Sequence, residues 1–273
     1  MSRDAASAER LQEEVPPALV IQDITKAFGG VVAVDRVSLQ VRRGETIALI
    51  GSNGAGKTSL MKIVTGELRP DAGRIWIDGT DVTRWSAWKR ARAGLGRSFQ
   101  VCRLFDEMTV VENLELAAVL GLRRAALSML RSIGPDERLR IDDALVKTEL
   151  GSLGSVRAGD LSQGDRKKLE IAMTAAAGFK VLCLDEPMSG VARGETARLK
   201  EVIETGAAID GLAILLVEHD LEVVFSVANS ILVMHGGRVI AAGSAEEIRS
   251  DAVVRRVYLG GGPGKSRQSF DKD

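Results

Sequence analysis

Residues 51–58 read Gly51-Ser52-Asn53-Gly54-Ala55-Gly56-Lys57-Thr58, and this stretch decides the fold. Two glycines five residues apart, followed by Lys and Thr, are typical of a loop that cradles phosphate groups. The flanks agree, because 46–50 is an apolar, β-branched run suited to a buried strand and 59–64 has the apolar spacing of a helix. An ordinary glycine-rich turn is the alternative, and the strand and helix on either side disfavour it.

The residue types in this loop suit the phosphates of a nucleotide and a magnesium ion. Glycines allow backbone N–H groups to approach phosphate oxygens, and the helix N-terminus adds a partial positive charge. Lys57 is expected to contact the β- and γ-phosphates of ATP, and the Thr58 hydroxyl to ligate Mg²⁺. The predicted nucleotide-binding residues of this stretch are Gly51, Ser52, Asn53, Gly54, Ala55, Gly56, Lys57, Thr58 and Ser59.

Bulk composition disfavours several classes of protein. The chain has 273 residues, 45% hydrophobic and 27% charged, as in ordinary globular proteins. Its 37 basic residues balance its 37 acidic ones, so nucleic acid is not expected as a partner. Only Cys102 and Cys183 occur, which favours a reduced, cytoplasmic setting over secretion. No apolar run approaches the length of a membrane span, and the N-terminus lacks a signal-peptide pattern.

The order of predicted elements indicates one α/β domain with an inserted helical part. Alternating residues around the loop predict antiparallel strands, and helices alternating with apolar strands after residue 165 predict a parallel sheet covered on both faces. Residues from about 101 to 165 show no convincing strand and are interpreted as a helical subdomain. Asp106 or Thr109 is expected to cap its first helix, and a second helix is expected over 136–150. The predicted division is a flexible extension over 1–17, the domain over 18–259 and a disordered tail over 260–273.

A second candidate site follows the apolar strand 181–184, which ends in Asp185 and Glu186. The C-terminal edge of a parallel sheet is where ligands bind. There Asp185 would hold the Mg²⁺ water shell, and Glu186 would polarise the water that attacks the γ-phosphate. A solvated acidic turn is the alternative, and it loses weight because the same chain carries a phosphate loop.

Three further motifs occur in a fixed order along the chain. Gln100 comes after the phosphate loop, Leu161-Ser162-Gln163-Gly164 opens a helix before the acidic strand, and His219 follows the strand 213–217. Phosphate loop, glutamine, Leu-Ser-x-Gly, Asp-Glu strand and histidine, in this order, resemble the ATPase subunit of ATP-binding cassette (ABC) transporters. The resemblance covers about residues 19–259. It implies a P-loop NTPase fold with a RecA-like parallel core, an antiparallel β subdomain and an inserted α-helical subdomain.

The resemblance also implies a role for each motif. Phe28 would stack on adenine, Gln100 would sense the γ-phosphate and Mg²⁺, and His219 would contact the γ-phosphate. Ser162 and Gly164 would contact ATP held by a second subunit, so hydrolysis would need a head-to-tail dimer. Phe28 has the alternative of a surface or core aromatic, and His219 that of a structural histidine. The implied catalytic residues are Glu186, His219 and Gln100, and the implied magnesium ligands are Thr58, Gln100 and Asp185.

Two segments depart from the family pattern. Gln163-Gly164-Asp165 stands where the signature usually continues Gly-Gly-Gln. Past the acidic pair, Ala192 stands where the family commonly has Asp or Asn, and Arg193 where it often has Pro. Because that loop normally crosses the dimer interface, weaker coupling between the two ATP sites is expected.

Within the family, residues 96–105, 217–222 and 257–260 resemble the subunits that import branched-chain amino acids or related amides such as urea. The implied protein pairs with a second ATPase subunit, identical or different, and drives transmembrane permease subunits at the inner face of the cell membrane. One alternative is the ATPase of a lipid or solute exporter of the lipopolysaccharide-export type. Another is a soluble ATPase switch that is not coupled to transport.

Overall fold

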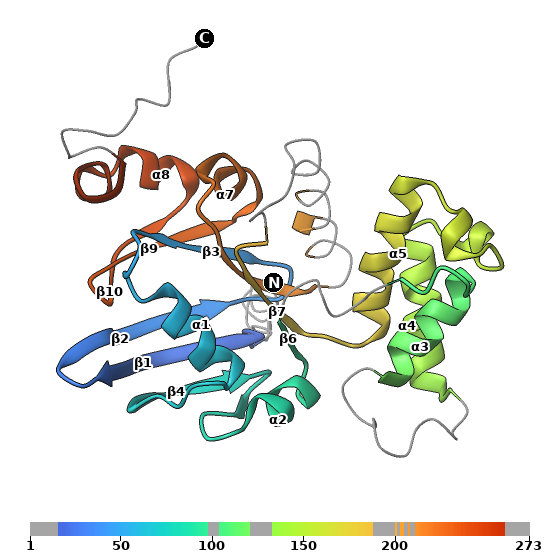
Figure 1. Ribbon diagram of the computed structural model, residues 1–273, viewed down its shortest axis with the longest axis horizontal. Helices are drawn as coiled ribbons and strands as arrows, with labels where there is room; N and C mark the ends of the chain where they lie inside the picture. The colour runs from blue at the N-terminus through green and yellow to red at the C-terminus, as the bar shows by residue number, and fades with distance from the viewer. Residues whose placement is uncertain are drawn as a thin grey trace, which may run out of the picture.

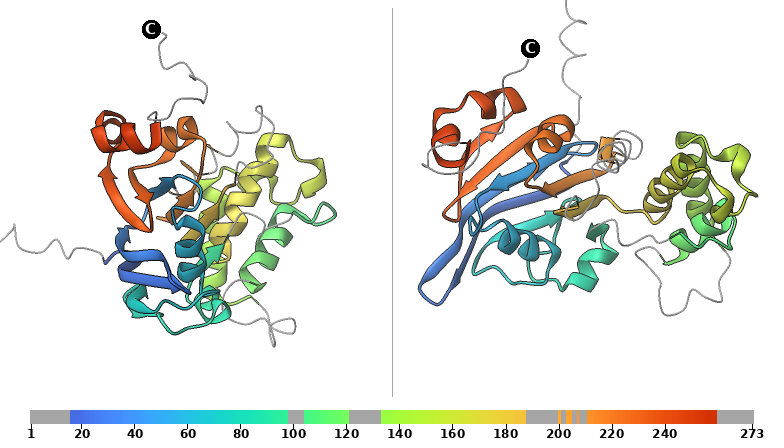
Figure 2. Two further views of the ribbon diagram at one scale, coloured as in Figure 1. Left: turned by 60° about the vertical axis from the view of Figure 1, so that its left-hand side comes forward. Right: turned by 45° about the horizontal axis from the view of Figure 1, so that its top comes forward.

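The computed structural model describes residues 16–97, 104–120, 133–187 and 211–259, together with 200, 203, 204 and 207. Two sheets and a group of helices make up the described chain, and Figure 1 and Figure 2 show the helical group set to one side of the sheets. The predicted combination of a parallel core, an antiparallel sheet and a helical part is confirmed.

The first sheet is antiparallel, with strand order β2-β1-β4-β5. Its longest pair, β1 and β2, forms a hairpin in which Phe28 pairs with Val31. The first strand continues up to the glycines at 29 and 30 because Lys26, Ala27 and Phe28 all find cross-strand partners. The strands are β1 (Leu19–Phe28), β2 (Val31–Val41), β4 (Ala72–Ile77) and β5 (Thr80–Asp81).

The second sheet carries the phosphate loop and has strand order β10-β9-β3-β8-β7-β6. Its strands pair in parallel, except for β10, which pairs antiparallel with β9. The sequence did not predict β6, because it is only three residues long and includes a glycine. The strands are β3 (Thr46–Gly51), β6 (Leu95–Arg97), β7 (Val181–Asp185), β8 (Ala213–Val217), β9 (Ser230–His235) and β10 (Arg238–Gly243).

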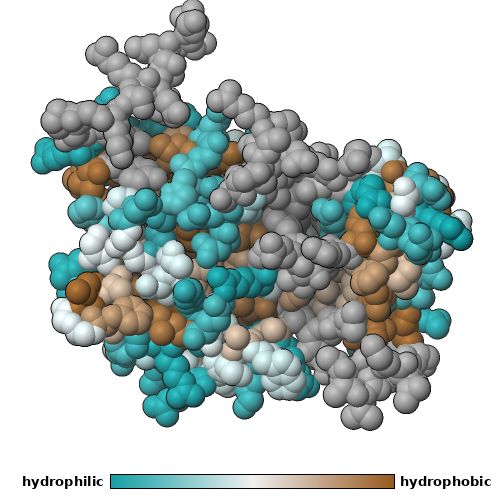
Figure 3. Space-filling view, in the orientation of Figure 1, coloured by the Kyte–Doolittle hydropathy of each residue, from teal (hydrophilic) through white to brown (hydrophobic). Residues whose placement is uncertain are grey.

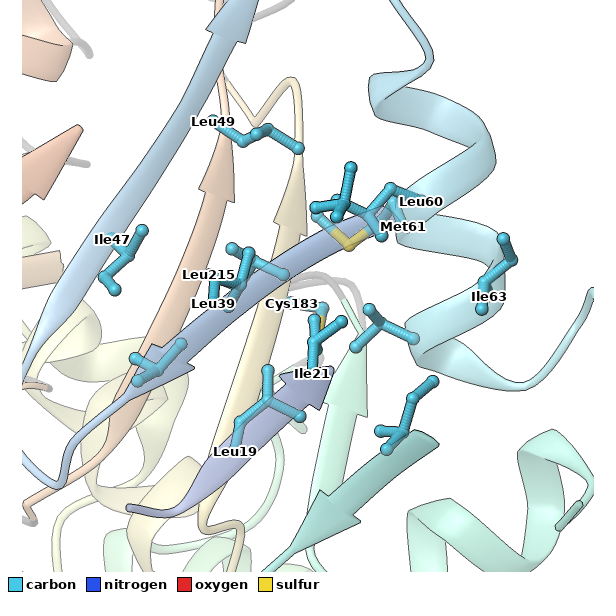
Figure 4. Packing of buried hydrophobic residues seen from close by; sticks show 14 of the residues in the cluster. Leu19, Ile21, Leu39, Ile47, Leu49, Leu60, Met61, Ile63, Cys183 and Leu215 are labelled. Carbon is cyan, nitrogen blue, oxygen red and sulfur yellow. The ribbon is translucent and has the colours of Figure 1, made fainter. Parts of the chain in front are cut away.

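The second sheet is buried on both faces, which explains its continuous apolar strands. Alternate residues of β3 serve different cores: Ile47 and Leu49 pack toward the antiparallel sheet, and Ala48 and Ile50 pack toward the helices on the other face. Figure 4 shows the first of these cores, where side chains of both sheets meet those of α1. The helices flanking the sheets are α1 (Lys57–Thr65), α2 (Ala87–Arg92), α7 (Leu221–Val227), α8 (Ala245–Ser250), α9 (Ala252–Val254) and the π-helical turn η5 (Arg255–Leu259).

The helical group has its own apolar core, to which α3, α4 and α5 all contribute. Thr109 caps α3: its hydroxyl accepts a hydrogen bond from the Glu112 N–H, and Glu112 accepts one from the Thr109 N–H. The second predicted helix ends at Lys147 rather than at 150, because Glu149 adopts a left-handed conformation with φ 58°. The elements are α3 (Val110–Leu120), α4 (Pro135–Lys147), η3 (Gly151–Leu153), η4 (Ala158–Asp160) and α5 (Gln163–Ala176).

Within the described ranges, none of the helices has the length and hydrophobicity that crossing a bilayer requires.

Candidate functional site

The phosphate loop joins β3 to α1, and packing fixes its shape. Gly56 precedes α1 with φ 103°, and a Cβ there would lie 2.2 Å from the Ala33 carbonyl oxygen of β2. A Cβ at Gly51 would lie 2.2 Å from the Met234 carbonyl oxygen. No side chain caps the N-terminus of α1, and its first turn contains no acidic residue. The loop therefore presents uncapped N–H groups in a tight backbone cradle, as phosphate binding requires.

Lys57 points back into this loop. Its side chain is buried, with 5% exposed, and Nζ donates hydrogen bonds to the Gly51 and Ser52 carbonyls at 2.7 and 3.2 Å. Burial lowers the pKa of Lys57, while Glu186 and Asp185 oppose this shift through their negative charge. The amine is thus held inside the loop and is electrostatically coupled to the acidic pair.

Asp185 ends β7 and lies beside a cation that the sequence did not single out. Arg97 Nη2, at the end of the neighbouring strand β6, lies 3.5 Å from Asp185 Oδ2. Arg97 also pairs with Glu67, just beyond the end of α1, and this contact raises the pKa of Arg97. The only feature of the sequence that pointed to Arg97 was its position three residues before Gln100. Arg97 connects the candidate magnesium carboxylate to the helix of the phosphate loop.

Glu186 and His219 are brought together from neighbouring strands. Glu186 has φ 50°, and its N–H donates to the Val217 carbonyl of β8 at 2.8 Å. This turn aims the carboxylate at the end of β8, where Glu186 Oε1 lies 2.6 Å from His219 Nε2. The buried Glu218 side chain accepts a hydrogen bond from the His219 N–H at 2.6 Å and so fixes the backbone there. The two candidate catalytic side chains therefore form a contact pair that solvent can reach.

Ser162 and Gly164 lie on another part of the molecule. Ser162 caps α5: its hydroxyl accepts from the Asp165 N–H at 3.1 Å and donates to the Asp165 carboxylate at 2.6 Å. Gly164 is exposed. Because α5 packs with α3 and α4, apart from α1, the structure does not join these residues to the phosphate loop of the same chain (Figure 1).

Phe28 lies at the tip of the β1–β2 hairpin, where it is 48% exposed and its neighbours Val31 and Val32 are exposed as well. Figure 3 shows hydrophobic surface along this hairpin. Lys26 Nζ lies 5.6 Å from the Phe28 ring centroid, and Asp71 holds the same amine at 2.6 Å. The ring is therefore available for stacking, and packing of Phe28 in the core is excluded.

Two predicted features lie outside the described residues. Gln100 falls between 97 and 104, and the atypical Ala192 and Arg193 fall between 187 and 200.

The described residues fit a magnesium ion that is held mostly by phosphate. Among them, no group of three or more His, Cys, Asp or Glu side chains is placed to hold a metal ion. Thr58 is exposed in the first turn of α1, and Asp185 is partly exposed at the end of β7. Mg²⁺ typically takes one or two protein oxygens and completes its shell with phosphates and water.

Comparisons with known proteins settle the family. A model of the ABC transporter ATPase domain, described as "ABC transporter", matches residues 34–189, which is more than half of the chain. This chain belongs to the ABC transporter ATPases. A second model, described as "Branched-chain amino acid ATP-binding cassette transporter", matches residues 238–263. As an ABC ATPase, the protein binds ATP and hydrolyses it to drive transport, which confirms the predicted family and enzyme class.

Similar ABC ATPases extend over nearly the whole chain. The transport ATP-binding protein BraF of Pseudomonas aeruginosa is 36% identical over 250 residues, covering 89% of this chain and 98% of that protein. LptB, a lipopolysaccharide export ATP-binding protein of Haemophilus influenzae, is 33% identical, with coverages of 89% and 97%. The crystal structure of MJ1267 in its ADP conformation has a TM-score of 0.67 and 30% identity, and covers 89% of this chain and 99% of its own. The ABC ATPase fold is thereby established.

Proposed function

We propose that this ABC ATPase drives the uptake of branched-chain amino acids or related small amides. The observation that carries the proposal is the match of residues 238–263 to the model of branched-chain amino acid ATP-binding cassette transporters. BraF and LivG, which are named as branched-chain amino acid transport proteins, support it at 36% identity. LptB is nearly as similar, so lipid or solute export is the second candidate.

In the proposed mechanism, the triphosphate enters the loop between β3 and α1. The uncapped N–H groups at the start of α1 donate to phosphate oxygens, and Lys57 exchanges the Gly51 and Ser52 carbonyls for the β- and γ-phosphates. Phe28 stacks on adenine from the hairpin tip. The exchange is favourable because a buried ammonium gains a charged partner in place of neutral carbonyls.

Thr58, Asp185 and Gln100 are the residues that we expect to hold Mg²⁺. When bound, this ion neutralises charge on the β- and γ-phosphate oxygens. Arg97 keeps the Asp185 carboxylate at the end of β7, 3.5 Å from its own guanidinium. Asp185 is thereby positioned before any ligand arrives.

Glu186 is proposed to orient the attacking water and accept its proton. His219 holds Oε1 of this carboxylate at 2.6 Å, so one oxygen is fixed and the other is left for water. Gln100 is proposed to complete the site from the segment that follows β6. Since the pair lies open to solvent in a single chain, closing the site requires a further surface.

A second ATPase subunit is the proposed source of that surface. Ser162 and Gly164 would contact the ATP of the opposite subunit through the N-terminus of α5, and the assembled pair would act on transmembrane permease subunits. The Ser162 hydroxyl already donates a hydrogen bond to the Asp165 carboxylate at 2.6 Å, so a phosphate oxygen would have to take the place of that carboxylate. The atypical Ala192 loop is proposed to weaken coupling between the two sites, and an Ala192→Asp variant with unchanged ATPase cooperativity would contradict this.

The test of the ATPase mechanism compares Glu186→Gln with Glu222→Gln, which neutralises an exposed carboxylate nearby on α7. Glu186→Gln should bind Mg-ATP, lose nearly all turnover and form a dimer by light scattering, whereas Glu222→Gln should hydrolyse normally. Brisk hydrolysis by Glu186→Gln would remove this carboxylate from the mechanism. Lys57→Ala should lose tight ATP binding, and an unchanged dissociation constant would refute the proposed phosphate contact.

Uptake and export are separated in cells that lack the gene. The deletion should reduce accumulation of radiolabelled leucine, and the wild-type gene but not the Glu186→Gln gene should restore it. Normal uptake combined with loss of lipopolysaccharide from the cell surface would favour the export candidate instead.

A further inference from the structure

Arg90 is a buried cation attached to the far end of the phosphate-loop helix. It lies on α2, and its side chain is 1% exposed. Nη1 donates hydrogen bonds to the Ile63 and Val64 carbonyls at 2.6 and 2.8 Å, and Nη2 donates to the Thr83 carbonyl at 2.9 Å. Two of these carbonyls belong to the last turn of α1, which ends at residue 65.

The partners of this guanidinium are neutral. Its hydrogen-bond acceptors are backbone carbonyls, and Nε has no partner in the described part of the protein. Burial lowers the pKa of Arg90 to about 10, so the group is still charged at neutral pH. Burial also raises the pKa of the neighbouring Cys183 thiol to about 12, so Cys183 supplies no negative charge. Asp81 is exposed and hydrogen-bonded to Thr83, and its negative charge only partly offsets the effect of burial on the pKa of Arg90.

A buried charge whose hydrogen-bond partners are all neutral is costly, so the location of Arg90 is informative. A cation at a helix C-terminus is stabilised by the last carbonyls and by the helix dipole. With 9 residues, α1 is about 14 Å long, from the last turn that Arg90 contacts to the phosphate loop at its start. The helix and the apolar core around it lie between Arg90 and the loop, and they screen a charge less than water does.

We propose that Arg90 is a positioning residue for phosphate binding, which holds the last turn of α1 and adds a long-range positive potential at the phosphate loop. This rests on the proposed function, in which that loop binds the triphosphate. Coulomb's law at about 14 Å gives about a 1.7- to 7-fold change in affinity per ligand charge, for effective dielectric constants of about 80 to 20. A residue that only held the helix end would weaken all nucleotides by the same factor.

The experiment measures dissociation constants of ATP and ADP by calorimetry in EDTA, so that the two ligands differ by about one unit of charge. The variants are Arg90→Gln, Arg90→Lys and the control Lys89→Gln, which removes an exposed cation from the adjacent position of α2. Arg90→Gln should lower the preference for ATP over ADP by about 1.7- to 7-fold. Arg90→Lys and Lys89→Gln should keep the wild-type ratio.

Equal weakening of ATP and ADP by Arg90→Gln would overturn the proposal and leave a structural role alone. If Arg90→Gln does not fold, the neutral variant Arg90→Met is compared with Arg90→Lys, because lysine retains the charge but loses the forked hydrogen bonds. A lower ATP to ADP preference in Arg90→Met than in Arg90→Lys supports the proposal, and the same preference in both variants refutes it. Failure of the proposed function would give a different result. Either the wild-type protein would bind neither nucleotide, or the Lys57→Ala variant would bind ATP and ADP with the dissociation constants of the wild type.

Discussion

Replacing Gly56 with alanine tests whether packing against β2 fixes the phosphate loop. Gly56 has φ 103°, and a Cβ there would lie 2.2 Å from the Ala33 carbonyl oxygen. That oxygen belongs to the backbone of a long strand and cannot move without shifting β2. Gly54 provides a matched control in the same loop, since it has φ 80° and no atom within 4 Å of an added Cβ. Gly54→Ala therefore carries the conformational cost without the collision.

The expected cost has two parts. Left-handed backbone costs alanine about 1–2 kcal/mol, which applies to both variants. An overpacked contact adds about 1–3 kcal/mol, which applies to Gly56→Ala alone. Domains of 150–250 residues lose about 2–4 °C in melting temperature per kcal/mol, so Gly56→Ala should melt about 2–12 °C below Gly54→Ala.

Scanning calorimetry without nucleotide measures this difference directly, and ADP titration then shows whether the loop still binds phosphate. Gly56→Ala should also bind ADP more weakly than Gly54→Ala, because the displaced N–H groups no longer converge. Equal melting temperatures for the two variants would refute the reasoning, since the predicted collision would then have been relieved without cost.

Three other predictions concern single side chains. The hydrogen bond from Lys180 holds the pKa of Asp78 below its usual value, so this pair stabilises the fold above about pH 4 and the contribution is lost as pH falls through the lowered pKa. In urea titrations from pH 7 to 3, Asp78→Asn should therefore lose at most about 1 kcal/mol at pH 7 and show a shallower decline below pH 4 than the wild type. Cys183 is buried and its pKa is raised to about 12, so in a Cys102→Ser background Ellman's reagent should titrate no thiol until the protein unfolds. His219→Ala should lower kcat about 100-fold or more while leaving ATP affinity within about threefold, and equal losses in both would contradict its proposed role in orienting the catalytic carboxylate.

The elements that the sequence predicted well are those that a local pattern determines. The strands β3, β7 and β8 are apolar at consecutive positions because both faces of the sheet are covered, and such a run can be recognised in the sequence alone. The order of motifs in turn identified the family. The short strand β6 escaped prediction because its pairing with β7, from Leu95 with Val181 to Arg97 with Cys183, defines it more than its own residues do.

The contact between Glu186 and His219 illustrates what local patterns leave out. Thirty-three positions separate the two residues, and their contact depends on β7 lying beside β8 in the sheet. The left-handed turn at Glu186 depends on a hydrogen bond to Val217, which no propensity of glutamate predicts. The sequence could name both residues by resemblance, yet their mutual orientation follows only from strand order.

The basic residues between Asp81 and Asp106 show that a local charge pattern likewise does not predict where a charged side chain lies. Arg84, Lys89, Arg90, Arg92, Arg97 and Arg103 occur there without an acidic residue among them, a composition typical of an exposed basic surface. Instead, Arg90 is buried against the end of α1, and Arg97 bridges Glu67 and Asp185. A charge can be buried only where the fold brings acceptors to it, and for Arg90 these are carbonyls of α1 and of Thr83. Arg97 stays partly exposed and is held by carboxylates beyond the end of α1 and at the end of β7. Both arginines thus act on the helix and strand that carry the predicted ATP site, so a search for functional cations in such a chain should start from the unsatisfied ends of its helices rather than from its charge pattern.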